Sequence, residues 1–279
     1  MWFIELLKAI FLGIVEGITE WLPVSSTGHM ILVDEFIKLE LSPDFKEMFL
    51  VVIQLGAILA VPILFWNKLN PFSRGKSEGE KKATLTLWGR VIVGAIPAAV
   101  IGLIFDDILE QYLYTPTVIA IALIVYGIGF IVVERIKKKR GDTFRITDVS
   151  ELSLKDALVI GFYQVLSLIP GTSRSGSTIL GGMLSGVSRV ASAEFSFFMA
   201  IPIMLGASGY KILKFILKGV AVSGTEIALL LVGILVAFLV SLATIKFLMD
   251  FVKRHSFSAF GIYRIILGVA VIIYFLFAV

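Results

Sequence analysis

The stretch EGITEWLPVSSTGHM, residues 16–30, is the feature from which the fold can be predicted. A second stretch of the same kind, QVLSLIPGTSRSGSTI, occupies residues 164–179. In each, an apolar helix-like run stops at a proline, is followed by a hydroxyl-rich turn, and resumes as an apolar helix. In hydrocarbon every backbone N–H and C=O needs a partner, so such breaks are tolerated only where protein or water surrounds them. We therefore interpret the two stretches as two halves of one site.

The composition excludes an ordinary soluble domain. Of 279 residues, 58% are hydrophobic, and the mean hydropathy is +0.96. The isoelectric point of about 9.2 does not indicate nucleic-acid binding, because the basic residues cluster in loops between apolar runs, as they do in membrane proteins. The chain has no cysteine, which excludes disulfides and thiolate catalysis.

Six apolar runs approach the roughly 20 residues that a transmembrane helix needs. We predict an all-α polytopic membrane protein, with a single membrane domain over residues 1–279. It contains six transmembrane helices plus two re-entrant helix–turn–helix pairs at about residues 2–37 and 157–187. The six spans are expected at roughly 48–66, 85–105, 116–133, 193–210, 226–249 and 257–277.

The chain also divides into two similar halves. Residues 1–140 and 150–279 each contain one re-entrant pair and three spans, and the short motif AVPIL at 60–64 returns as AIPIM at 200–204. Because three spans is an odd number, the second half is inverted relative to the first, and inverted repeats place a joint site near the midplane.

Charge predicts the orientation. The loops after residues 66 and 133 are strongly basic, whereas the segment 106–110, expected to be a loop, is acidic. By the positive-inside rule the basic side is cytoplasmic, so both termini are external. Three lysines oppose this assignment, because it puts Lys211, Lys214 and Lys218 outside.

Glu16 and Glu20 are four residues apart and share one helix face. In apolar surroundings two carboxylates this close repel one another unless they share a proton or a cation. They are therefore candidate ligands for a divalent ion, or one of them is a general base. The alternative is that they only line a water-filled crevice.

His29 follows the first hydroxyl-rich turn and is a candidate general acid or base. Ser26 beside it is a candidate nucleophile, or alternatively only a phosphate ligand. A structural, hydrogen-bonded histidine is the alternative for His29. The second histidine, His255, falls in a basic loop and is expected to be solvated.

Arg174 stands in the second turn, and a guanidinium matches phosphate oxygens in a bidentate fork. Its alternative role, as an ion-pair partner of Glu16 or Glu20, is compatible with anion binding. Free N–H groups at a helix start also favour an anion, although hydroxyls there can act as caps alone. The expected phosphate-binding residues are Ser25, Thr27, Gly171, Thr172, Ser173, Ser175 and Thr178.

Two glutamines are weaker candidates for the site. Gln54 lies inside a span, and Gln164 occupies the repeat position of Glu16. Helix–helix hydrogen bonding is an equal alternative for both. Four charged residues near predicted interfaces are instead expected to snorkel or to form ion pairs; these are Arg90, Arg189, Glu194 and Arg264.

The two signature stretches resemble those of the bacterial undecaprenyl-diphosphate phosphatase family, also called the bacitracin-resistance protein family. The resemblance covers essentially the whole chain and includes VVIQLGAILAV around Gln54, AEFSFFMAIP from Ala193 and YRIILG from Tyr263. It implies an enzyme of the bacterial cytoplasmic membrane that hydrolyses undecaprenyl diphosphate to the monophosphate and phosphate. Such an enzyme recycles the carrier for peptidoglycan and confers bacitracin resistance.

The resemblance also implies catalytic roles for Glu16, Glu20, Ser26, His29 and Arg174, stimulation by a divalent cation such as Mg²⁺ or Ca²⁺, and a site opening to the outer face. The expected partners are the polyprenyl diphosphate lipid and the bilayer, with a homodimer as one possible assembly. Ser26 activated by His29 attacks the terminal phosphorus, or His29 and a glutamate activate water. The competing class is a transporter or flippase of a phosphorylated polyprenyl lipid, because inverted repeats with broken helices are a transporter architecture.

Overall fold

The computed structural model describes residues 2–141 and 143–277, which form helices with no strand among them. The first half contains α1 (Trp2–Thr19), α2 (Ser26–Phe36), α3 (Pro43–Val52), α4 (Gln54–Leu64), α5 (Trp66–Leu69), α6 (Glu78–Leu113) and α7 (Pro116–Lys139). The second half contains the short 3₁₀ turn η1 (Val149–Glu151), α8 (Leu154–Val165), η2 (Leu166–Leu168), α9 (Arg174–Leu184), α10 (Arg189–Leu217), α11 (Gly224–Arg254) and α12 (Ser258–Phe277).

Six segments of the described chain are long and apolar enough to cross a membrane, as the sequence predicts. They are Pro43–Leu64, which α3 and α4 form together, Glu78–Phe105, Pro116–Lys139, Arg189–Leu217, Gly224–Arg254 and Ser258–Phe277. The spans are longer than their apolar runs. In particular, the acidic segment expected as a loop at 106–110 is helical and belongs to the end of α6; its acidic side chains lie outside the described part of the structure.

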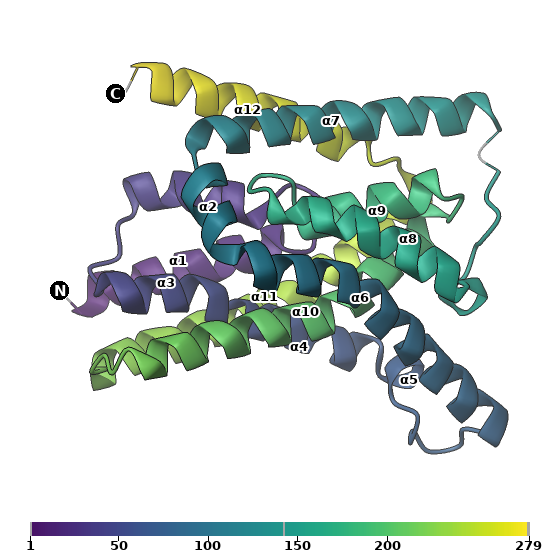
Figure 1. Cartoon of the computed structure of the whole chain (residues 1–279), viewed down its shortest axis with the longest axis horizontal. Helices are drawn as coiled ribbons and strands as arrows, with labels where there is room; N and C mark the ends of the chain where they lie inside the picture. Colours follow the sequence, from purple (N-terminus) through teal and green to yellow (C-terminus); the bar gives the residue numbers. More distant parts are fainter. Residues whose placement is uncertain (1, 142, 278–279) are drawn as a thin grey trace.

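The two broken segments form helix hairpins that approach each other from opposite ends of the molecule (Figure 1). Hairpin 1 comprises α1 and α2, and hairpin 2 comprises α8 and α9. Both first helices end before the prolines, at Thr19 and Val165, so that Pro23 and Pro170 lie within the connections. The insertion of each hairpin into a membrane and its return to the same side stay a prediction.

Each hairpin packs against the opposite half of the chain. α1 lies along α11, and α8 lies along α6. The same exchange holds for α7, which lies along α12 (Figure 1). The two halves are therefore interlocked, and neither buries its own hairpin alone.

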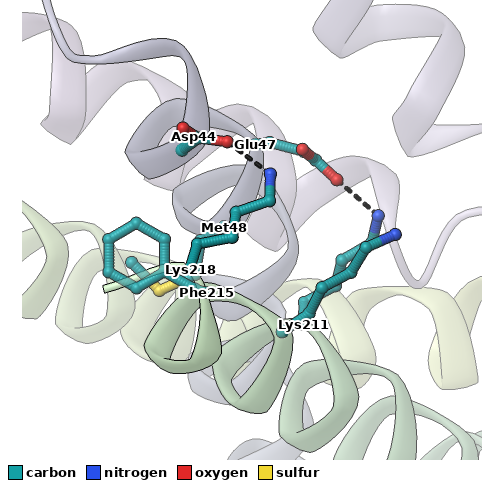
Figure 2. Close-up of a pocket in the computed structure, with 7 residues that line it drawn as sticks. Asp44, Glu47, Met48, Lys211, Phe215 and Lys218 are labelled. Carbon is teal, nitrogen blue, oxygen red and sulfur yellow. Dashed lines mark hydrogen bonds and ion pairs between the residues drawn. The ribbon is translucent and has the colours of Figure 1, made fainter. Parts of the chain in front are cut away.

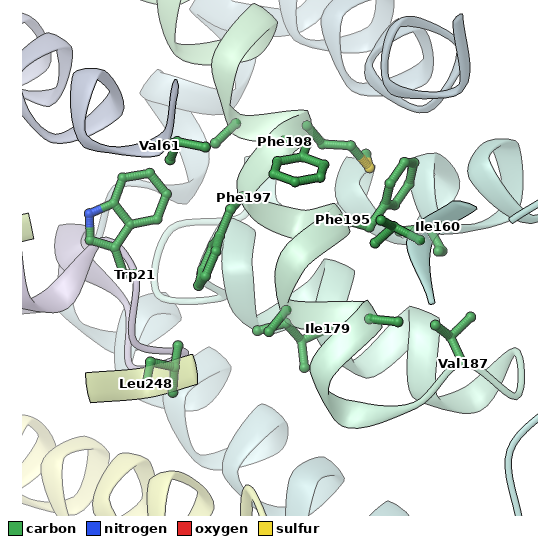
Figure 3. Packing of buried hydrophobic residues seen from close by; sticks show 14 of the residues in the cluster. Trp21, Val61, Ile160, Ile179, Val187, Phe195, Phe197, Phe198 and Leu248 are labelled. Atoms are coloured by element: carbon green, nitrogen blue, oxygen red, sulfur yellow. The ribbon is translucent and has the colours of Figure 1, made fainter. Parts of the chain in front are cut away.

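The largest hydrophobic cluster surrounds the meeting point of the hairpins (Figure 3). Trp21 at the tip of hairpin 1 packs edge-on against Phe197 of α10, with ring centroids 5.2 Å apart. Ile179 of α9 and Leu248 of α11 belong to the same cluster. Because aromatic side chains bury a large area in fixed orientations, this core holds the two tips in one arrangement.

Three of the charged residues predicted to lie near interfaces form ion pairs or hydrogen bonds in the structure. Arg189 at the start of α10 forms a bidentate pair with the buried Glu134 of α7, and Glu134 also accepts the backbone N–H of Phe257. Glu194 is likewise buried and paired, with Lys68 at 2.6 Å. Arg90 is half-buried and donates to the carbonyl of Ser150.

The three lysines that oppose the predicted orientation lie at the end of α10, facing α3 (Figure 2). Lys211 pairs with Glu47, and Lys218 pairs with Asp44. With Lys214, the cluster holds three cations and two carboxylates. Its formal charge is therefore +1, but acidic residues contribute little to the positive-inside rule, so these lysines still oppose the predicted orientation.

Candidate active site

The tips of the two hairpins are built alike. Ser25 caps α2 by accepting the N–H of Gly28 at 3.2 Å, and Ser173 caps α9 by accepting the N–H of Gly176 at 3.1 Å. Side-chain oxygens at this position replace the missing partners of the first helical N–H groups. The two caps place the first residues of the helices, Ser26 and Arg174, at equivalent positions of the repeat.

Glu20 joins the two tips. Its Oε2 accepts a hydrogen bond from Ser26 Oγ at 2.7 Å, and its Oε1 accepts one from Arg174 Nη2 at 2.9 Å. Ser175 of hairpin 2 also reaches hairpin 1, donating to the backbone carbonyl of Glu20 at 3.2 Å. The predicted nucleophile, one predicted carboxylate and the predicted phosphate-binding arginine therefore lie in one hydrogen-bonded chain.

Arg174 is held from two further sides. Its Nη1 donates to the carbonyl of Ser196 at 2.8 Å, and its guanidinium lies 5.7 Å from the centre of the Trp21 ring. Its Nε has no partner in the described structure. The guanidinium is therefore positioned by α10 and by hairpin 1, with one donor left for a ligand.

Glu16 lies one helical turn before Glu20 and is 1% exposed. It is within electrostatic range of both Glu20 and Arg174, and its Oε1 has no hydrogen-bond partner. A buried carboxylate oxygen without a donor is costly. It is therefore the oxygen of this site that is available to a cation.

The ring nitrogens of His29 contact Ser25 and Tyr263 and not Ser26. Its Nδ1 lies 2.7 Å from the carbonyl of Ser25, which can only accept, so Nδ1 carries the proton. Its Nε2 lies 2.6 Å from the hydroxyl of Tyr263 on α12. In this arrangement Ser26 is bonded to Glu20 and His29 to Tyr263, whereas the sequence had suggested a bond between Ser26 and His29.

Of the remaining predicted residues, the threonines lie at or near the two tips, and the two glutamines lie outside the hydrogen-bonded chain. Thr178 donates to Ser196 Oγ at 2.7 Å; Thr172 is buried near the tip, and its hydroxyl has no partner; Thr27 is half-buried in the first turn of α2. The two glutamines are not in this chain of hydrogen bonds. Gln54 begins α4, and Gln164 lines a separate cavity.

Arg264 of α12 is the residue that sequence reasoning assigned wrongly. It neither snorkels nor forms an ion pair, because it is fully buried and donates to carbonyls of both tips. Nη1 bonds Pro23 O at 3.1 Å, and Nη2 bonds Gly171 O at 2.8 Å and Thr172 O at 3.0 Å. The polar pair Tyr263–Arg264 inside an apolar span was the available signal, since ionisable residues within spans are usually functional.

The arrangement is chemically suited to bind an anion. The N-termini of α2 and α9 converge with two guanidinium groups, and helix N-termini bind anions readily. Comparison with known proteins identifies the family. The family model described as bacitracin resistance protein BacA matches residues 9–270 of the chain. The chain belongs to this family.

Relatives in the BacA family are similar over almost their whole length. The chain is 59% identical to an undecaprenyl-diphosphatase of Enterococcus faecalis, over 97% of each protein. It is 55% identical to the undecaprenyl-diphosphatase of Desulfitobacterium hafniense, over 98% of this chain and 96% of the relative. The match to undecaprenyl-diphosphatase 1 of Clostridioides difficile is 56%, over 98% and 97%.

Proposed function

We propose that this chain is an undecaprenyl-diphosphatase, which hydrolyses undecaprenyl diphosphate to undecaprenyl phosphate and inorganic phosphate. By doing so it recycles the lipid carrier of cell-wall synthesis and confers bacitracin resistance. The observation that carries the proposal is the chain from Ser26 through Glu20 to Arg174. It joins a hydroxyl, a base and a phosphate-binding cation where two helix N-termini converge.

In the proposed reaction Arg174 and the N–H groups of both tips bind the terminal phosphate. Ser26 Oγ attacks phosphorus, its proton passes to Glu20, and the bond to the bridging oxygen breaks to release undecaprenyl phosphate. Water then attacks the phosphoserine, Glu20 returns its proton to Ser26 Oγ as the bond from that oxygen to phosphorus breaks, and phosphate leaves with the protons of the water. Glu20 is positioned as the base because it already accepts the hydrogen bond from Ser26.

A divalent cation fits this site. The two glutamates and two arginines have a formal charge of zero, so a bound diphosphate brings negative charge that they do not balance. Glu16 has a free buried oxygen, whereas both oxygens of Glu20 are bonded. Mg²⁺ commonly uses one or two carboxylates together with phosphate oxygens and waters. Glu16 would hold such an ion together with phosphate oxygens and waters, and the ion would supply charge neutralisation of the diphosphate.

The test is phosphate release from a long-chain prenyl diphosphate by the purified full chain in detergent, with and without EDTA. We expect release from wild type, and its loss in Ser26→Ala and Arg174→Ala. Ser185→Ala is the matched control, because the hydroxyl of this serine, just after α9, bonds the carbonyl of Gly181 and no residue of the site. Retained release in EDTA would remove the cation from the proposal. No release from folded wild type would favour a transporter.

Rapid quench separates the two chemical routes. Accumulation of phosphate on Ser26 during turnover, absent in Ser26→Ala, is expected for attack by the serine. Turnover without any phosphoserine would overturn that step and favour water activated by Glu20.

We infer an inner-membrane location in which the end carrying α5 and the Lys137–Lys139 run faces the cytoplasm, so that both termini and the mouth of the site face outward. The chain has no cysteine of its own. A single Lys218→Cys should therefore react with an impermeant maleimide on intact cells, and a single Lys138→Cys should react only after lysis. The reverse labelling pattern would show that the chain has the opposite orientation in the membrane. The homodimer stays a prediction.

A further inference from the structure

A cavity of about 390 Å³ lies between α6, α8 and α10, outside the hydrogen-bonded chain of the active site. Its walls are almost entirely apolar, with Ile96 and Ala99 from α6, Leu168 from η2, and Ile203 and Gly206 from α10. The volume is within the range of roughly 300–1,000 Å³ that small-molecule pockets occupy. The cavity is therefore large enough to hold part of a ligand.

The helices α6 and α8, which both line the cavity, are in close contact at one pair of glycines. They touch where a Cβ at Gly161 would lie 2.3 Å from the carbonyl of Gly94. In hairpin 1 the corresponding contact continues for another turn, since Gly17 lets α1 approach the carbonyl of Ala237. The repeat places Val165 where hairpin 1 has Gly17. Val165 carries a branched side chain and ends α8, so hairpin 2 has no second glycine contact of this kind.

Gln164 gives the cavity one polar end. Its side chain is fully buried, and neither its amide oxygen nor its amide nitrogen has a hydrogen-bond partner. Buried amides are nearly always satisfied, because an unsatisfied one retains the full desolvation penalty. The position also matters, since Gln164 is the repeat equivalent of Glu16 in the active site. An apolar pocket with one unsatisfied amide matches an amphiphile with a long apolar body and a polar head.

We propose that this cavity holds the first isoprene units of the lipid substrate, with the Gln164 amide bonding an oxygen of the diphosphate head. The proposal rests on the proposed diphosphatase activity and assigns the binding site of the substrate's tail. The tail must begin beside the tip of hairpin 2, and Leu168, which lines the cavity, is directly followed by that tip. Ile96 and Leu103 are exposed at the outer side of the cavity, so the rest of the chain can continue into hydrocarbon.

Gly206 allows the cavity to be filled without disturbing the helix. A Cβ there meets no atom within 4 Å, and the same is true at Gly209, which does not line the cavity. Gly206→Phe should lower kcat/KM for C55 and C15 prenyl diphosphates about tenfold, mainly through KM. It should lower hydrolysis of isopentenyl diphosphate by a smaller factor, because its single C5 unit fills only the start of the cavity. Gly209→Phe is the matched control and should alter neither. An equal effect on all chain lengths, or no effect on any, would overturn the tail site.

A binding measurement keeps the tail site separate from the activity. A photoreactive C15 prenyl phosphate should crosslink wild type within residues 92–103 and 202–210, and Gly206→Phe should lose these crosslinks. Their presence in a wild type that releases no phosphate would retain the tail site and reject the diphosphatase. Crosslinks confined to α7 and α12, or equal competition by a phospholipid, would reject the tail site while leaving the diphosphatase intact.

Gln164→Leu tests the polar end. Because it removes an unsatisfied buried amide, it should leave the Tm of the ligand-free protein unchanged or higher. It should also reduce the Tm increase that the C15 prenyl phosphate produces. A lower ligand-free Tm, with the ligand-induced increase unchanged, would show that Gln164 is only structural.

Discussion

Ser25 and Ser173 have the same unusual backbone conformation, with φ of 74° and 71°, and they are the only non-glycine residues with positive φ in the described structure. Each caps the second helix of its hairpin. Positive φ in a residue with a Cβ is strained. The same strain at equivalent positions of an inverted repeat indicates that the site needs this turn, because it directs Ser26 and Arg174 toward Glu20.

The first prediction separates two effects of Ser25 and Ser173 on stability: the hydrogen bond that caps the helix, and the strain of the positive φ. Ser25→Ala and Ser173→Ala lose the cap and keep the strain, so each should be destabilised by about 1 kcal/mol. Ser25→Gly and Ser173→Gly relieve the strain and should be at least as stable as wild type in thermal unfolding. Ser188, the cap of α10 with φ of −64°, is the control, since glycine gains nothing there. Equal losses for alanine and glycine at Ser25 would contradict a strained turn.

The second prediction concerns the general base. Glu20→Gln should lower kcat/KM by at least about 10²-fold, the usual contribution of general base catalysis. His29→Ala and Tyr263→Phe should each cost less. The double variant should be no worse than His29→Ala, because the two residues act through one hydrogen bond. Steady-state kinetics measures all four. Larger damage from His29→Ala than from Glu20→Gln would restore histidine as the base.

The third prediction concerns Arg264, which we regard as a positioning residue. Arg264→Lys keeps the charge but not the planar fork that reaches Pro23 and Gly171 together. It should lower the stability by at least about 2 kcal/mol, because buried carbonyls lose their donors, and it should lower kcat more than it raises KM. Arg90→Lys, at a half-buried arginine that bonds the carbonyl of Ser150 and neither tip, should change neither. An unaffected kcat in Arg264→Lys would show that the tips hold their geometry without it.

The fourth prediction concerns pH. Burial raises the pKa of the Asp156 carboxyl, but hydrogen bonds from Arg145 and Ser153 lower it more, so its pKa lies below the ordinary value. A depressed pKa stabilises the fold above the unfolded-state pKa, about 4, and this contribution is lost as the pH falls through the folded-state pKa.

Asp156→Asn should therefore reduce stability by about 1.5 kcal/mol at pH 7, with the difference from wild type shrinking steadily below about pH 4. Thermal unfolding across this range measures it. Asp250→Asn is the control, because its pair with Lys253 is exposed and contributes little. A difference that persists unchanged in acid would show that the Asp156 charge is not responsible.

The local features of the fold were readable from residue patterns. The six spans follow from apolar length, and the two breaks follow from proline and hydroxyl-rich turns, which need no partner elsewhere to be recognised. Span ends were less predictable: the acidic segment at 106–110 is helical, because α6 continues past its apolar run. The drop in hydropathy at residue 106 marks the end of the apolar run, but not the end of the helix, which continues to Leu113.

The sequence predicts which residues belong to the site, but it does not predict which of them bond to one another. The sequence by itself determined that Glu20, Ser26 and Arg174 belong to polar breaks in a membrane protein, because ionisable residues there are costly. Only the tertiary structure decided that Ser26 bonds Glu20, that His29 bonds Tyr263, and that Arg264 ties both tips together. The last two of these contacts join segments far apart in the chain, up to 241 positions for Arg264 and Pro23. Their geometry depends on how interlocked helices pack, which spacing along one chain does not encode.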